Sequence, residues 1–99
     1  MSHWIEFVYR EFFDVPRSLV LYHHDRLVFL ESTFSETECE FSDDYQLYLL
    51  PENVDLSGSW NHLAGAAIRR LGSIPIAHVQ FDPSRRRMLN IGSLRQLLP

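Results

Sequence analysis

The residues that could do chemistry begin with two histidines and an aspartate, His23, His24 and Asp25, inside the apolar stretch LVLYHHDRLVF. Imidazole and carboxylate groups are common metal ligands and general acids or bases. Adjacent side chains of a regular strand point to opposite faces, however, so His23 and His24 do not converge on one ion unless a turn redirects them. The stretch therefore favours a turn between two strands over a metal or catalytic site.

The same stretch predicts a β-hairpin in which His24 and Asp25 form a two-residue loop and His23 pairs with Arg26. Such a loop needs positive φ at both positions, and histidine and aspartate are enriched there. Both faces of this hairpin are apolar, one with Leu19, Leu21, Val28 and Leu30 and the other with Val20, Tyr22, Leu27 and Phe29. A sheet with one solvated face alternates apolar and polar residues. The hairpin is therefore expected either to be central to a barrel or sandwich, or to have one face covered by a partner.

Other groups of the kind used in catalysis are isolated in the sequence. Cys39 is the only cysteine, and its neighbours Glu38 and Glu40 disfavour the reactive thiolate, so we expect an unreactive, partly buried side chain. His62 and His78 are expected to point to solvent from separate elements. No serine stands in a nucleophile-elbow motif. The sequence predicts no catalytic residue, no metal and no cofactor, with an enzyme or a small-ligand-binding protein as the less favoured alternative.

A run of carboxylates lies in the segment FSETECEFSDD. Glu36, Glu38 and Glu40 would share one side of an extended segment. Charged side chains on an edge strand prevent edge-to-edge aggregation, which is the interpretation we favour. A cation site is the alternative, but the glycine-containing loop pattern of calcium sites is absent.

The charge of the chain is divided between its two parts. Residues 1–56 contain three arginines against twelve acidic residues, a net charge of −9, whereas residues 57–99 contain six arginines against one aspartate, a net charge of +5; together these give −4. The two parts are expected to attract each other within one fold or between two copies. The acidic balance argues against nucleic acid as a partner. The arginines Arg85, Arg86 and Arg87 are interpreted as a solvated loop or as a rim that docks the acidic edge of another chain.

An antiparallel sheet and one helix are the elements expected to position these residues. Alternation predicts a strand at 4–12, the hairpin, and further strands near 45–50, 76–82 and 86–92. Ser59 can cap a helix over 59–71 that Gly72 ends. We therefore predict an α+β fold in one domain, residues 1–99: an antiparallel curled sheet or partly open barrel of five to six strands, with the main helix packed on it.

The function expected from these features is that of a non-catalytic protein-interaction or self-associating module, a homodimer or the partner of another protein. An acidic inhibitor or immunity-type protein that binds a basic partner is the alternative. The 45% hydrophobic content excludes intrinsic disorder, and the lack of a long apolar stretch or signal peptide predicts a cytoplasmic protein without membrane association. The predicted interaction surface consists of Leu19, Leu21, Val28, Leu30, Glu36, Glu38, Glu40, Arg85, Arg86 and Arg87.

Overall fold

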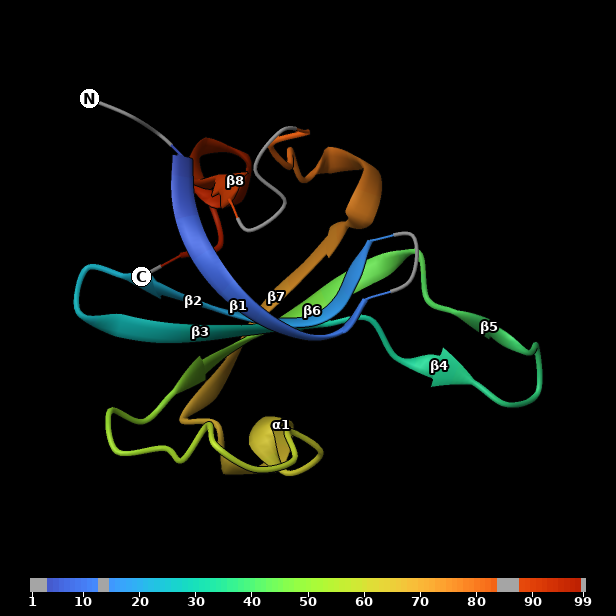
Figure 1. The fold of residues 1–99 in the computed structure, drawn as a ribbon, viewed down its shortest axis with the longest axis horizontal. Helices are drawn as coiled ribbons and strands as arrows, with labels where there is room; N and C mark the ends of the chain where they lie inside the picture. Colours follow the sequence, from blue (N-terminus) through green and yellow to red (C-terminus); the bar gives the residue numbers. More distant parts are fainter. Residues whose placement is uncertain (1–3, 13–14, 84–87, 99) are drawn as a thin grey trace.

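The computed structural model describes residues 4–12, 15–83 and 88–98 of the 99-residue chain. Six strands form one antiparallel sheet in the order β7-β6-β3-β2-β1-β8 (Figure 1). In the described part of the chain its edge strands do not pair with each other, so the antiparallel sheet is confirmed but is open. Its strands are β1 (Trp4–Phe12), β2 (Pro16–His23), β3 (Arg26–Glu31), β6 (Asp44–Leu50), β7 (Arg69–Pro75) and β8 (Met88–Asn90). The remaining elements are the paired strands β4 (Phe34–Ser35) and β5 (Glu40–Phe41), the α-helix α1 (Leu63–Ala66), and the 3-10 helices η1 (Ile76–His78) and η2 (Ile91–Leu94).

The hairpin between β2 and β3 has the predicted register. His23 pairs with Arg26, and the two residues between them form the loop. His24 has a φ of 50° and Asp25 a φ of 62°, the left-handed region that a two-residue hairpin loop requires. The Tyr22 hydroxyl donates a hydrogen bond of 3.0 Å to Asp25 Oδ1. The residue types of this stretch were therefore sufficient to predict the element.

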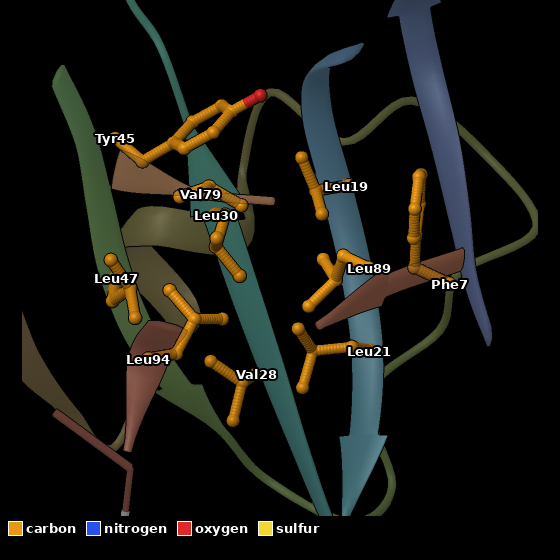
Figure 2. Packing of buried hydrophobic residues seen from close by; sticks show 10 residues of the cluster. All are labelled: Phe7, Leu19, Leu21, Val28, Leu30, Tyr45, Leu47, Val79, Leu89 and Leu94. Atoms are coloured by element: carbon orange, nitrogen blue, oxygen red, sulfur yellow. The ribbon is translucent and has the colours of Figure 1, made fainter. Parts of the chain in front are cut away.

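The C-terminal part of the chain covers one face of the sheet. Leu21 of β2 and Val28 of β3 belong to a buried cluster that also contains Val79, Leu89 and Leu94 (Figure 2). The other members shown are Phe7, Leu19, Leu30, Tyr45 and Leu47. These side chains come from both ends of the sequence, so this core is formed only when the last quarter of the chain returns to the sheet.

The segment that contains α1 covers the opposite face, below the sheet in Figure 1. Phe29 of β3 meets the Trp60 ring edge to face, with a distance of 6.2 Å between the ring centroids. Trp60 Nε1 donates a hydrogen bond of 3.0 Å to the Leu56 carbonyl, and Leu63 is fully buried beside the same rings. The chain itself thus covers one apolar face of the hairpin and most of the other, on which Tyr22 is exposed, with the sheet as the middle layer.

The predicted helix over residues 59–71 is wrong, because only the four residues of α1 are α-helical. Ala67 is already extended, with φ −64° and ψ 148°, and Arg69 begins β7, which pairs with β6. Gly65 lowers the helix propensity of this stretch by about 1 kcal/mol relative to alanine. A short helix is marginal by itself, whereas an added edge strand gains a ladder of backbone hydrogen bonds. Tertiary pairing therefore overrides the local helical pattern.

Gly72, which was expected to end that helix, lies inside β7 instead. The register between β6 and β7 shifts between Leu47 and Tyr48, and Gly72 has a φ of 144°. A Cβ atom at this position would lie 2.9 Å from Leu97 Cδ2. The glycine therefore permits both the backbone conformation and the close approach of the C-terminal segment.

The strand predicted near 76–82 is also wrong. Pro75 ends β7, and η1 follows it directly, because proline lacks the N–H that would continue a ladder. Phe81 contributes only an isolated bridge to Leu89. The strand predicted at 86–92 is confirmed in part as β8, whose Leu89 pairs with Ile5 of β1. In the described residues, no helix has the length and apolar character needed to cross a membrane.

Candidate functional site

A short hairpin projects from the sheet beyond the ends of β3 and β6 (Figure 1). It consists of β4, a turn at residues 36–39 and β5, and we call residues 34–41 the acidic arm. Phe34 pairs with Phe41 across it, and their rings meet edge to face with 5.1 Å between the centroids. The Ser42 N–H donates to the Thr33 carbonyl at 2.8 Å, which closes the arm where it leaves the sheet.

The charge of the arm lies at and beside its turn. Glu36, Glu38 and Glu40 are all exposed, and among the described residues none of them forms an ion pair. The expected extended segment with three carboxylates along one side is wrong, because residues 36–39 turn back and Cys39 has a φ of 55°. Ser35 Oγ accepts a hydrogen bond from the Glu38 N–H at 3.3 Å, which helps to hold this turn.

Cys39 is exposed in the turn, so the expectation of a partly buried side chain is wrong as well. Its Sγ lies 3.5 Å from the Glu36 carbonyl, within reach of a weak hydrogen bond. Glu38 and Glu40 flank it along the chain.

Polar contacts fasten the base of the arm to the sheet. Arg17 of β2 donates from Nη1 to Ser32 Oγ at 3.2 Å, and Ser32 Oγ donates to the Ser42 carbonyl at 2.8 Å. The Arg17 guanidinium carbon lies 4.8 Å from the centroid of the Phe41 ring. Ser32 is buried, so these bonds hold the two roots of the arm at a fixed place on the sheet.

A cavity of about 510 Å³ opens between the base of the arm and the segment that contains α1; we call it the base cavity. Phe34, Phe41 and Trp60 contribute aromatic rings to its lining, and Glu11 and Glu31 contribute carboxylates. Serine, threonine and asparagine side chains and one arginine, Arg10, complete the lining. Binding cavities of this size combine apolar walls with a few polar groups that set the orientation of a ligand.

Of the two acidic residues of the base cavity, Glu31 has a shifted pKa. Glu31 is half-buried, and this burial raises the pKa of its carboxyl above the ordinary value; the charge of Glu11 raises it further. Arg10 is held at another wall, with its guanidinium carbon 4.8 Å from the centroid of the Trp60 ring and its Nη2 donating to the Leu56 carbonyl at 3.2 Å. The cavity is therefore a place where a further positive charge would be stabilised.

The histidines within the part of the chain that the structure describes do not form a common site. His23 and His24 stack on each other, with their ring centroids 3.9 Å apart, and burial followed by the charge of His24 lowers the pKa of His23. His62 and His78 are exposed and lie on separate elements, as expected. Across residues 4–12, 15–83 and 88–98, no three His, Cys, Asp or Glu side chains are grouped so that they could hold a metal ion.

The aliphatic residues of the predicted interaction surface are buried in the core. Leu19, Leu21, Val28 and Leu30 are at most 1% exposed and belong to the core under the C-terminal segment, so they do not form a surface in this fold. The predicted arginines at 85–87 lie outside the described residues. The exposed apolar residues Val8 and Tyr22 lie on the opposite face instead, beside an open depression of about 860 Å³.

Comparison of the chain with protein-family models, with curated proteins and with solved structures gives no match. Function must therefore be inferred from the residues themselves. The acidic residues of the arm were identified from the sequence, whereas Glu11, Glu31 and Trp60 of the base cavity were not. Those three residues come from separate elements, and no spacing in the sequence connects them.

Proposed function

We propose that the protein is a non-catalytic protein-interaction module that binds a basic surface of a partner protein with its acidic arm. This corresponds to the acidic inhibitor or immunity-type function considered above. The observation that carries it is the projection of exposed carboxylates at 36, 38 and 40, which form no ion pair within the described residues, on a hairpin whose base is fastened to the sheet. A projecting element of one charge is well suited to approach a complementary surface first.

Electrostatic complementarity supports this function physically. Opposite charges steer two proteins toward each other and suppress wrong partners, and this effect weakens as salt increases. The arm also carries Phe34, whose side chain is 53% exposed. Aromatic side chains are enriched in protein interfaces and frequently provide much of the binding energy. The arm thus combines long-range attraction with an apolar contact residue.

Self-association is a second form of the proposed interaction. The sequence favours it through the second apolar face of the β2–β3 hairpin, but the segment that contains α1 covers most of that face. The division of charge between the two parts of the chain still favours contact between an acidic region of one copy and a basic region of another. We therefore rank binding of a separate basic partner first.

The test compares two triple variants that remove the same charge from different places. The arm variant carries Glu36→Gln, Glu38→Gln and Glu40→Gln, and the control carries Glu6→Gln, Glu52→Gln and Asp55→Asn, which are exposed elsewhere. The probe is a fluorescein-labelled peptide of alternating glycine and arginine, whose dissociation constant is measured by fluorescence anisotropy at low salt.

The arm variant should bind the peptide about tenfold more weakly than the wild type. Three exposed charge contacts contribute roughly 0.5 kcal/mol each, and about 1.4 kcal/mol corresponds to a factor of ten. The control should lose clearly less affinity, since its charges lie away from the arm. Equal losses in the two variants would show that only net charge matters, and the proposal would then be wrong.

A further inference from the structure

The base cavity lies where the acidic arm leaves the sheet, so a partner that contacts the arm also passes its opening. Its charged lining consists of two carboxylates, Glu11 and Glu31, and one guanidinium, Arg10. The balance at neutral pH is therefore negative. Beside the cavity, the three glutamates of the arm add to the same potential. A cationic group is the ligand that this distribution of charge favours.

Stacking of arginine on aromatic rings already occurs at two places around the base cavity. The guanidinium of Arg10 lies over Trp60 and that of Arg17 lies over Phe41, each with its central carbon 4.8 Å from the ring centroid. Phe34 is the lining ring with the largest exposed surface, at 53%. A planar cation that enters the cavity can therefore pack against Phe34 in the way that the resident arginines pack against their own rings.

Glu31 supplies the charge that such a cation would meet. Its side chain is half-buried, and among the described residues it makes no hydrogen bond or ion pair. Burial and the nearby charge of Glu11 both oppose its ionisation, as its raised pKa shows. A positive group beside Glu31 would oppose both effects, because an opposite charge favours the ionised form.

We propose that the base cavity binds an arginine side chain of the basic partner, with the guanidinium against Phe34 and paired with Glu31. This inference rests on the proposed function, since it names the residue by which the partner is anchored. Arginine is preferred over lysine because its planar guanidinium both stacks on a ring and donates two parallel hydrogen bonds to one carboxylate. The acidic arm then attracts the partner, and the base cavity selects the anchoring residue.

The test uses a small probe that is too short to span the arm. The 15N-labelled full chain is titrated with N-acetyl-arginine amide, and separately with N-acetyl-citrulline amide, which has nearly the same shape but no charge. Chemical shifts of the Phe34 amide and the Trp60 indole N–H report on the cavity. Titration to about 50 mM covers dissociation constants in the millimolar range. The arginine probe should shift both signals, and the citrulline probe should bind at least about fivefold more weakly.

Two variants and a control test which side chains of the base cavity bind the arginine probe. Glu31→Gln keeps the shape of the side chain and should weaken binding of the arginine probe about fivefold; Phe34→Ala should weaken it as well. Glu52→Gln, at an exposed position outside the cavity lining, should leave binding unchanged. Amide spectra of each variant show whether it is folded. Equal binding of the arginine and citrulline probes, or an absence of shifts at the cavity, would overturn the inference.

The two proposals fail in different ways. In one case the triple arm variant loses peptide binding, but the arginine probe does not shift the signals of the base cavity. This result would leave the proposed function standing and overturn the arginine pocket. In the reverse case the arginine probe shifts the signals of Phe34 and Trp60, but the arm variant binds the peptide as the wild type does. This result would support the arginine pocket and remove the arm from the proposed function.

Discussion

The cover of the second sheet face can be tested by replacing Leu63 with alanine. Leu63 is fully buried in the cluster that also contains Phe29, Leu50 and Trp60. The substitution removes three buried carbons at about 0.8 kcal/mol each, or about 2.4 kcal/mol, before any cost of the remaining cavity. Leucine-to-alanine changes in cores cost about 2–5 kcal/mol in total. We expect Leu63→Ala to lower the free energy of unfolding by about 3 kcal/mol.

The assay is equilibrium unfolding in urea, followed by circular dichroism, with thermal unfolding as a second measurement. A loss of about 3 kcal/mol should lower the midpoint temperature by roughly 12–24 °C in a domain of this size. Ile68→Ala is the matched control, because Ile68 follows the same segment but is 57% exposed; it should change stability by no more than about 0.5 kcal/mol.

An equally small effect of both substitutions would refute the reasoning about the cover. It would mean that the segment containing α1 does not pack on the sheet in solution. The face formed by Val20, Phe29 and Leu50 would then be open, and a partner or second copy would be needed to cover it. The experiment therefore also decides between a self-contained fold and one completed by association.

Two further predictions concern the hairpin loop and the base cavity. Replacement of Asp25 by valine should lower the free energy of unfolding in urea by about 1–2 kcal/mol, because a β-branched residue is strained at a φ of 62°. The control His24→Asn should have little effect, because asparagine tolerates positive φ. Equal stability of the two variants would contradict the assigned loop. Glu31→Gln should raise the free energy of unfolding at pH 7 and leave it unchanged well below the ordinary carboxyl pKa of 4.5. The reason is that the pKa of Glu31 is raised in the folded state, so the wild type loses stability as pH rises from the unfolded-state pKa through the folded-state pKa. A variant less stable than the wild type at pH 7 would contradict this sign.

The β2–β3 hairpin could be predicted from the sequence because its requirements are local. His24 and Asp25 tolerate positive φ, and the apolar residues on both sides of them set the register. The strand β1 was predicted for the same reason, from alternation alone. In these elements each residue is compatible with the conformation that its neighbours require, so local and tertiary preferences agree.

The stretch at residues 59–71 could not be assigned correctly because its pattern suits two structures. Trp60 and Leu63 face the sheet, as a helix would place them, but Arg69 and Arg70 are compatible with either a helix end or a charged edge strand. The decisive contact is the pairing of Arg70 with Tyr48, which is distant in the sequence. The base cavity was missed for the same reason, since Glu11, Glu31 and Trp60 meet only through the fold.

The distribution of charge on the arm is the strongest reason to place function there. Neither core cluster contains a residue of the acidic arm, so the arm is not part of the packing that buries the sheet. Three like charges within five residues repel one another, and charges needed only for solubility would be dispersed over the surface and not placed beside an exposed phenylalanine. The arm adds little to the fold and combines an exposed aromatic ring with concentrated charge. We therefore propose a basic partner that would cover the ring and neutralise the charge.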